Sequence, residues 1–268
     1  MGKYLVKQEN CLEGLRKLKR QSVDVVVTSP PYNIKMNYGE YEDNLSECAY
    51  LQFIREVVIE IYRVLKDDGS FFLNIGSQAS NKELEFRLIH NIITPYNVSG
   101  NPTEVFQLQN HVTWVKSIAF EDDARGHYKP INSPRFLSGL HESVYHLTKN
   151  KEVPIDKLSI GVPYKDKSNT KRYGKGNDLR SRGDVWFLPY KTVTTKRDHP
   201  CPFPPELPEF CIKLHGQDRC NYVLDPFCGS GNTLLAAKNL GIKKALGFEI
   251  DPNYVKLTED KLDLNKKT

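Results

Sequence analysis

One segment near the end of the chain constrains the fold most strongly, because it reads as a strand, a glycine turn, a helix, a second strand and an acid. Residues 222–224 form a short apolar run that leads into Asp-Pro-Phe-Cys-Gly-Ser-Gly at 225–231. A helix is predicted from there to Leu240, and the next strand, 245–248, ends at Glu249. Strand–helix–strand units of this kind favour an α/β fold with a mainly parallel sheet.

The glycine turn also restricts the ligand. Gly229 and Gly231 let the backbone turn sharply and approach a ligand, and a carboxylate at a strand end can accept both hydroxyls of a ribose. A Gly-x-Gly alone is weak, because many strand-to-helix turns use glycine. The third glycine of the dinucleotide fingerprint is missing, and no Gly-Lys-Ser/Thr follows. These absences count against NAD and FAD and against a phosphate-binding P-loop. The turn therefore indicates an adenosyl cofactor without a pyrophosphate.

A second motif follows an earlier strand. The β-branched run at 23–28 predicts a buried strand, and Ser29-Pro30-Pro31-Tyr32 stops it, since proline cannot continue a ladder. Open α/β sheets bind ligands at this end of their strands. A plain Pro-Pro turn explains the motif equally well when it is taken alone. Downstream, an Asn44-x-x-Glu47 cap, a helix from Leu51 to Leu65, a turn at 66–69 and a strand at 71–75 predict a second βαβ unit.

Composition excludes several classes of protein. The 268 residues allow one large domain with a sizeable core. No apolar run approaches the roughly 18 residues of a membrane span, and the N-terminus lacks a secretory signal. The six cysteines fit no zinc spacing. We therefore expect a cytoplasmic protein with reduced thiols, no metal and no membrane partner.

The charge is concentrated in one place. Between residues 164 and 197, ten Lys and Arg face three Asp, a net +7 that exceeds the +5 of the whole chain. Tyrosine, tryptophan and phenylalanine are interleaved with these charges, and apolar periodicity is absent. A solvated loop would explain a charge run alone. The mixture of basic and aromatic residues favours a nucleic-acid surface.

Together these motifs resemble the β-class DNA amino-methyltransferases, the S-adenosylmethionine-dependent group of restriction–modification systems. Members carry Asp/Asn/Ser-Pro-Pro-Tyr first, then a target-recognition region, then Phe-x-Gly-x-Gly, and this chain has that order. Blocks at 63–69, 199–204 and 247–251 also match. The resemblance covers most of the chain outside roughly 80–190. It implies an α/β, Rossmann-like methyltransferase fold with a mainly parallel central sheet, helices on both faces, circularly permuted motifs and a small recognition insert.

The resemblance also implies the domain organisation and the site. We expect a single catalytic domain over 1–268, with target recognition at approximately 120–197. The expected catalytic residues are Ser29, Pro30, Pro31 and Tyr32. The expected residues around S-adenosylmethionine are Asn10, Thr28, His199, Phe203, Asp225, Phe227, Gly229, Gly231, Thr233 and Glu249. The expected DNA-binding residues are Lys171, Arg172, Arg180, Arg182, Lys196 and Arg197. Asn10 departs from the family, which often has an acid there to receive the adenine amino group of the cofactor.

The implied chemistry is amine methylation. An exocyclic base amine is a poor nucleophile, because its lone pair is delocalised into the ring. The resemblance assigns two acceptors for the amine hydrogens, the Ser29 hydroxyl and the Pro30 carbonyl. Tyr32 would stack on a target base flipped out of the helix. Methyl transfer would then be an in-line displacement helped by positioning.

The first residue of the tetrapeptide bears on the target. In this family Ser-Pro-Pro-Tyr usually accompanies cytosine N4 methylation, and Asp-Pro-Pro-Tyr usually accompanies adenine N6 methylation. Cytosine in double-stranded DNA is therefore the favoured target, with adenine as the alternative. RNA and protein-glutamine methyltransferases mostly have the unpermuted order, and a non-catalytic regulator would not need the intact motifs. A cognate restriction endonuclease and a homodimer are further partners that the resemblance leaves open.

Overall fold

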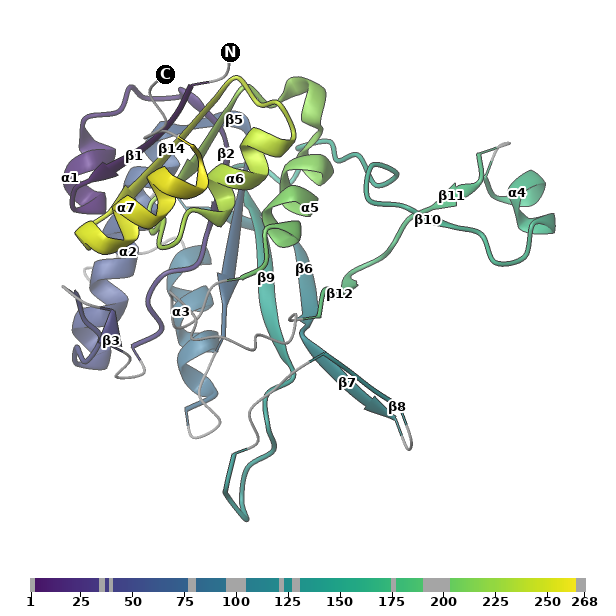
Figure 1. Cartoon of the computed structure of the whole chain (residues 1–268), viewed down its shortest axis with the longest axis horizontal. Helices are drawn as coiled ribbons and strands as arrows, with labels where there is room; N and C mark the ends of the chain where they lie inside the picture. Colours follow the sequence, from purple (N-terminus) through teal and green to yellow (C-terminus); the bar gives the residue numbers. More distant parts are fainter. Residues whose placement is uncertain are drawn as a thin grey trace.

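The protein is built on one large twisted sheet with helices on both faces (Figure 1). The computed structural model describes residues 3–33, 37–38, 41–76, 81–94, 105–120, 123–126, 131–174, 177–189 and 203–263. In spatial order the eight strands are β1 (Lys3–Gln8), β14 (Lys244–Glu249), β13 (Tyr222–Asp225), β2 (Val23–Thr28), β5 (Leu65–Ile75), β9 (His141–Thr148), β6 (Gln107–Val115) and β12 (Val185–Phe187). Neighbours pair in parallel except on either side of β9, which runs antiparallel to β5 and β6. The expected mainly parallel α/β sheet is confirmed.

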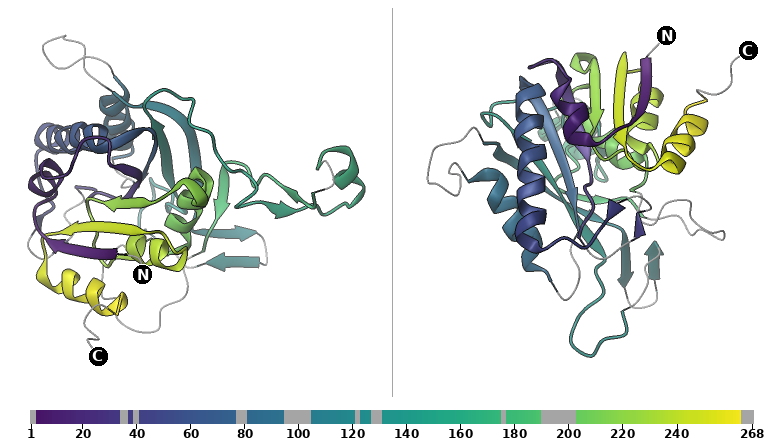
Figure 2. Two further views of the ribbon diagram at one scale, coloured as in Figure 1. Left: turned by 90° about the horizontal axis from the view of Figure 1, so that it is seen from above. Right: turned by 90° about the vertical axis from the view of Figure 1, so that its left-hand side faces the viewer.

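Two hydrophobic cores lie on the two faces of this sheet. Strand β2 contributes to both: the side chains of Val25, Val26 and Val27 alternate, so that Val26 faces one core and Val25 and Val27 face the other. Val23 faces the same core as Val26, because the register is irregular between Val23 and Val25. The first core is covered by α1 (Cys11–Arg16), α2 (Glu47–Val64) and α3 (Glu83–Ile93). The second is covered by α5 (Glu206–His215), α6 (Asn232–Asn239) and α7 (Pro252–Lys261). Figure 2 shows the two helical layers on opposite sides of the strands.

The strand directions determine where a ligand can bind. Strands β1, β14, β13, β2 and β5 are mutually parallel, so all five end at the same edge of the sheet. Helix α1 follows β1 at that edge, with Asn10 as its N-cap. Helix α6 follows β13 in the same way after the glycine turn. The loops that join these strands to their helices therefore converge on one edge, as in other open α/β sheets.

Two projections extend from the β6–β12 side of the sheet (Figure 1). One is the hairpin of β7 (Ser117–Phe120) and β8 (Asp123–Gly126). The other, here called the arm, is residues 155–183 and carries β10 (Val162–Pro163), α4 (Ser168–Arg172) and β11 (Leu179–Arg180). The expected recognition span of 120–197 thus contains both β8 and the arm, but also the sheet strands β9 and β12.

Local structure differs from expectation in the first βαβ unit. Ser46, rather than Asn44, caps α2, because its hydroxyl accepts from the Ala49 N–H at 3.3 Å. The helix ends at Val64, and β5 already starts at Leu65. The expected turn at 66–69 is instead a bulge in β5, since Val23 pairs with Leu65 while Val25 pairs with Ser70.

Short elements complete the fold. An antiparallel pair, β3 (Asn37–Tyr38) and β4 (Tyr41–Glu42), lies between β2 and α2 in the sequence. A 3-10 turn, η1 (Gln217–Arg219), joins α5 to β13. Among the described helices, none combines the length and the apolar character that crossing a membrane would require.

Candidate active site

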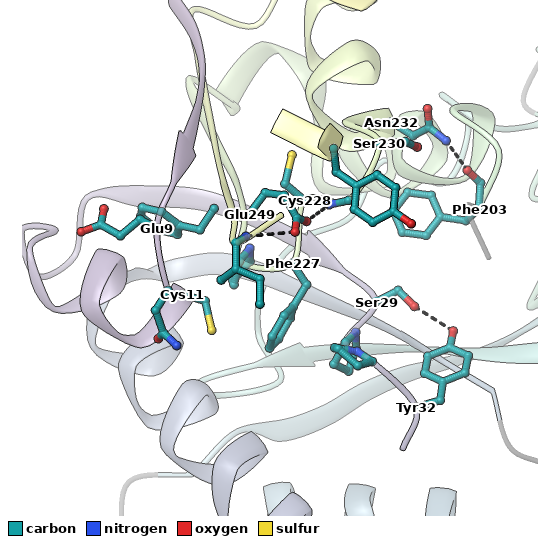
Figure 3. A pocket seen from close by; sticks show the side chains of 18 of the residues that line it. Glu9, Cys11, Ser29, Tyr32, Phe203, Phe227, Cys228, Ser230, Asn232 and Glu249 are labelled. Carbon is teal, nitrogen blue, oxygen red and sulfur yellow. Dashed lines mark hydrogen bonds between the residues drawn. The ribbon is translucent and has the colours of Figure 1, made fainter. Parts of the chain in front are cut away.

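A pocket lies at the edge where the parallel strands end, between the loops that follow β1, β2, β13 and β14. Figure 3 shows its lining side chains converging from these loops and from α2 and α7. The residues that line it are Glu9, Asn10, Cys11, Ser29, Pro30, Pro31, Tyr32, Phe53, Phe203, Pro226, Phe227, Cys228, Gly229, Ser230, Asn232, Phe248, Glu249, Ile250 and Tyr254. The structure therefore brings both sequence motifs into a single site.

Glu249 is the carboxylate that lines the pocket beside the glycine turn. Its Oε2 accepts from the Gly229 N–H at 2.7 Å, and its Oε1 accepts from the N–H groups of Ile250 and Asp251 at 2.9 and 3.0 Å. Burial raises the pKa of this carboxyl, and the three backbone donors oppose that shift. The carboxylate is thus held rigidly by backbone, with lone pairs left to accept hydroxyl hydrogens.

The glycine turn closes around this carboxylate. Gly231 has φ +77°, a left-handed conformation, and a Cβ there would lie 2.5 Å from Cγ2 of Thr258 on α7. Thr258 in turn donates from its hydroxyl to the Gly229 carbonyl at 3.0 Å. Only glycine fits between the turn and α7. The turn can therefore press against α7 while its other side, at Gly229 and Ser230, faces the pocket.

Asp225 and Thr28 lie beneath the pocket and link the strand before the Ser-Pro-Pro-Tyr turn to the strand before the glycine turn. The Thr28 hydroxyl donates to Asp225 Oδ1 at 2.6 Å, joining the ends of β2 and β13. The Phe227 N–H donates to the same oxygen at 3.1 Å. Burial raises the pKa of Asp225 to about 6 in spite of these hydrogen bonds. Both residues are buried, so they act on the site by holding the loops rather than by lining it.

The Ser-Pro-Pro-Tyr turn is fixed at its C-terminal half. The Tyr50 hydroxyl of α2 donates to the Pro31 carbonyl at 2.8 Å. Asn33 follows with φ +54°, and its backbone N–H donates to Asp43 Oδ1 at 2.8 Å. Ahead of these anchors, the two prolines fix φ at their own positions. Ser29 and Tyr32 consequently face the pocket together, with 2.7 Å between their hydroxyl oxygens (Figure 3).

A polar cluster lies behind this pair. Asn74, near the end of β5, donates from Nδ2 to Tyr32 Oη at 2.7 Å and to Glu142 Oε2 at 2.8 Å. Tyr32 donates from its hydroxyl to the same Glu142 oxygen at 3.1 Å. Lys116 Nζ pairs with Glu142 Oε1 at 2.8 Å. Glu142 belongs to β9 and reaches this edge because β9 is antiparallel.

The expected site residues fall into three groups. Those that line the pocket are Asn10, Ser29, Pro30, Pro31, Tyr32, Phe203, Phe227, Gly229 and Glu249. Those that support it from beneath are Thr28, Asp225, Gly231 and Thr233. His199 lies outside the described residues. The Asn10 side chain caps α1 by accepting from the Leu12 N–H at 2.9 Å, which leaves its carbonyl oxygen one further lone pair.

Several functional positions were not predicted. Phe53 and Tyr254 lie on α2 and α7 and had no sequence signal beyond their helices. Ile250, directly after Glu249, could have been inferred from its neighbour. Asn74 stands in the otherwise apolar run 71–75 of β5, and a polar residue there is the signal that would have found it. Glu142 stands among several polar residues of β9, so no local signal marks it.

The expected DNA-binding residues are spread along the arm. Lys171 and Arg172 are exposed on α4, and Arg180 is exposed on β11. Arg182 is different, because its Nε donates to the Ile160 carbonyl at 2.9 Å and its guanidinium lies 4.8 Å from the Phe210 ring centre. That residue anchors the base of the arm to α5. Lys196 and Arg197 lie outside the described residues.

Comparison with known proteins decides the family. The DNA methylase family model matches residues 23–260. The chain belongs to the DNA methylase family. The resemblance to amino-methyltransferases of restriction–modification systems is thereby confirmed, since the similar curated proteins include type II methyltransferases. M.HpaI of Haemophilus parainfluenzae is 27% identical over 95% of this chain and 72% of its own length. M.XycI of Xanthomonas campestris pv. cyanopsidis is 30% identical over 94% and 85%.

Other DNA methylases extend the comparison. The DNA adenine methyltransferase YhdJ of Escherichia coli K12 is 25% identical over 95% of this chain and 81% of its own. The solved PvuII DNA methyltransferase, described as cytosine-N4-specific, has a TM-score of 0.69 at 20% identity and covers 100% of this chain and 89% of that one. A DNA modification methylase of Thermus thermophilus in complex with S-adenosylmethionine has a TM-score of 0.61 at 23% identity, over 98% and 94%. The methyltransferase fold is therefore confirmed.

S-adenosylmethionine is the cofactor of this DNA methylase. The residues of the pocket fit it, because the backbone-held Glu249 carboxylate can accept ribose hydroxyls and the partly exposed ring of Phe227 offers apolar surface to an adenine. The Gly229–Ser230 backbone permits close approach beside them. Among the described residues, moreover, no group of acids, histidines and cysteines has the arrangement of a metal site.

Proposed function

We propose that this DNA methylase transfers a methyl group from S-adenosylmethionine to the N4 amine of a cytosine flipped out of a short duplex recognition sequence. The observation that carries the proposal is the shared pocket: Ser29 and Tyr32 lie in the same cavity as Glu249 and the glycine turn. A methyl donor held by the turn would thus be next to an amine held by the tetrapeptide. The serine at the first position favours cytosine over adenine.

The mechanism assigns each residue a step. Bound S-adenosylmethionine supplies an electrophilic methyl group on its sulfonium. The Ser29 hydroxyl and the Pro30 carbonyl accept the amine hydrogens, which localises the nitrogen lone pair toward that methyl group. The Tyr32 ring stacks on the flipped base. This stacking offsets part of the free energy that flipping costs, which is roughly a few kcal/mol. In this mechanism Asn10, Phe203 and Phe227 bind the cofactor beside Glu249, while Thr28, Asp225 and Thr233 hold the loops.

Duplex DNA would lie across the two projections. The arm carries exposed Lys171, Arg172 and Arg180 at a distance from the sheet, and basic residues are the groups that neutralise phosphates. Lys196 and Arg197 belong to the same basic segment of the sequence. We therefore propose that recognition within 120–197 is centred on the arm and the β7–β8 hairpin, with Arg182 as the anchor of the arm.

Adenine N6 methylation is the second candidate. The chemistry is the same for both amines, and the similar YhdJ protein is named as a DNA adenine methyltransferase. Protein and RNA substrates have less support, because the proteins named above that resemble this chain are named as DNA or type II methyltransferases. Action on cellular DNA in the cytoplasm, opposite a cognate restriction endonuclease, is the biological role that this proposal implies.

Expression in a host that lacks DNA modification tests the activity. Single-molecule sequencing of the host genome should show N4-methylcytosine at one sequence motif, and the signal should vanish in Ser29→Ala and in Tyr32→Ala. N6-methyladenine at a motif would correct the base only. An unmodified genome, from cells whose purified protein is folded and binds S-adenosylmethionine, would overturn the assignment to DNA.

A further inference from the structure

Glu142 contacts the Tyr32 hydroxyl without lining the pocket. It is the second residue of β9, and its side chain is 12% exposed. One carboxylate oxygen accepts from both Tyr32 Oη and Asn74 Nδ2, at 3.1 and 2.8 Å. The other is paired with Lys116 Nζ at 2.8 Å. A largely enclosed carboxylate with these donors stays in one orientation.

The direction of every hydrogen bond in this cluster follows from Glu142. An ionised carboxylate can only accept, so the single hydroxyl hydrogen of Tyr32 points to Glu142. The 2.7 Å contact between Ser29 and Tyr32 must then carry the serine hydrogen, donated to the tyrosine oxygen. Asn74 is oriented by the same rule, because its Nδ2 and not its Oδ1 faces the carboxylate.

As a result, the Ser29 oxygen is oriented to accept a hydrogen bond. With its own hydrogen donated away, Ser29 Oγ presents lone pairs, and the 3.4 Å contact from Asn74 occupies at most one of them. An amine hydrogen needs an acceptor of this kind. The opposite orientation, with the serine hydrogen pointing into the pocket, would repel the amine hydrogens and leave the lone pair of the nitrogen delocalised.

We propose that Glu142, held by Lys116, is a positioning residue that fixes the direction of the Tyr32–Ser29 hydrogen bonds so that Ser29 accepts from the target amine. The inference rests on the proposed function, because it needs an amine substrate in the pocket. It holds equally for cytosine and adenine, whose amines pose the same problem.

The substitution Glu142→Gln tests the proposal with little change in shape. Lys116 would retain the amide oxygen as its acceptor, so the amide nitrogen would face Tyr32 and donate to it. The tyrosine hydrogen would turn toward Ser29, and the chain of hydrogen bonds would reverse. We expect kcat to fall about 10²-fold, as when one hydrogen bond to a transition state is removed, while the KM for DNA and the Kd for S-adenosylmethionine stay within twofold.

A double-mutant cycle separates this role from a merely structural one. The assay is methyl transfer to a synthetic duplex that carries the sequence found in the host genome. Tyr32→Phe keeps the ring but removes the hydroxyl that joins Glu142 to Ser29. Adding Glu142→Gln to this variant should therefore change kcat less than twofold. Independent structural effects would instead multiply. Glu142→Asp keeps the charge and should retain more activity than Glu142→Gln.

The control is Glu85→Gln. Tyr145, also on β9, donates to Glu85 Oε1 at 2.9 Å, so this variant weakens a comparable tyrosine–glutamate bond away from the pocket. It should keep kcat within twofold. Full kcat in Glu142→Gln, or equal losses in Glu142→Gln and Glu85→Gln, would overturn the proposal while leaving the proposed function intact. A wild-type protein that methylates no duplex would instead overturn the proposed function, and this proposal with it.

Discussion

At the scale of single residues, one pocket brings together Ser29 and Tyr32 from the first part of the chain with Gly229 and Glu249 from the last part. Each of these four residues stands in a local sequence pattern whose chemistry can be recognised within a few positions, so the sequence predicts them. Glu142 could not be predicted in this way, because its partner Tyr32 is 110 residues distant and only the pairing of β9 with β5 brings them together.

The glycine at 231 gives a prediction at this scale. Gly231→Ala should lower the free energy of unfolding by about 1–3 kcal/mol, from the left-handed backbone and the overlap with Thr258 together. It should also weaken binding of S-adenosylmethionine, since relief of that overlap moves the turn that carries Gly229. Urea unfolding and titration calorimetry measure the two effects.

Gly241 supplies the matched control for this variant. It also has positive φ, +68°, but a Cβ there has nothing within 4 Å. Gly241→Ala should therefore show only the cost of the left-handed backbone, about 1–2 kcal/mol, with normal cofactor binding. Equal behaviour of the two variants would mean that contact with Thr258 does not shape the turn.

At the scale of elements, apolar runs predicted the central strands, and the peripheral strands were missed. Strand β2 is buried at every position, and its sequence is correspondingly β-branched. Strand β1 buries only Val6, because it is an edge strand with lysines facing solvent. Strand β9 carries the buried polar residues Ser143, His146 and Thr148, and the last two form hydrogen bonds with side chains of β5 and β6. No local pattern can indicate that such residues will be satisfied.

The arm gives a prediction at this scale. Replacing Lys171 and Arg172 together by alanine should weaken duplex binding and reduce the slope of log K against log salt by up to about two, at roughly 0.9 per phosphate contact. Binding of S-adenosylmethionine should not change, because α4 lies far out on the arm (Figure 2). Fluorescence anisotropy over a series of salt concentrations measures the slope.

A charge-matched control is available at the opposite edge of the sheet. Lys19 and Lys243 are exposed and precede β2 and β14, so they lie where the parallel strands begin rather than where they end. Lys19→Ala with Lys243→Ala removes the same charge and should leave the salt slope unchanged. A similar loss in both double variants would indicate a general charge effect and no contact of the arm with DNA.

At the scale of the whole molecule, two buried histidines make the stability of the folded protein depend on pH. Ser70 Oγ lies 2.9 Å from both His146 Nε2 and His215 Nδ1, which joins β5, β9 and α5. Burial lowers the pKa of His146 to about 3 and that of His215 to about 4, from 6.5. The folded protein thus does not bind protons that the unfolded chain binds below pH 6.5, so acid favours unfolding.

We therefore expect the free energy of unfolding to fall between pH 6.5 and pH 4, by about 2 kcal/mol per histidine at pH 5. The carboxyl of Asp225 acts in the opposite direction, because its raised pKa of about 6 lets the folded state bind a proton first. Asp225 contributes in the same way to wild type and to His146→Gln, so its contribution cancels when the two proteins are compared. The variant should lose less stability between pH 7 and pH 5, measured by urea unfolding.

The exposed His141, on the same strand, is the control. His141→Gln should leave the pH dependence of unfolding as in wild type. If His146→Gln and wild type followed the same curve from pH 7 to pH 5, the buried histidine would not be the source of acid sensitivity.

The reversed direction of β9 sets limits on how this enzyme could be engineered. A chimaera that takes its recognition segment from a relative needs joints between the two sequences. Those joints would fall close to β9, the strand that begins beside Tyr32. If the joint fell inside 140–148, Glu142 would be supplied by the donor and its pairing with Lys116 would depend on a foreign register. Two separate exchanges, one with both joints within 117–140 and one with both joints within 153–184, would leave the recipient's own β6 and β9 in place. New specificity would then be grafted without exchanging the parts that orient the catalytic hydroxyls.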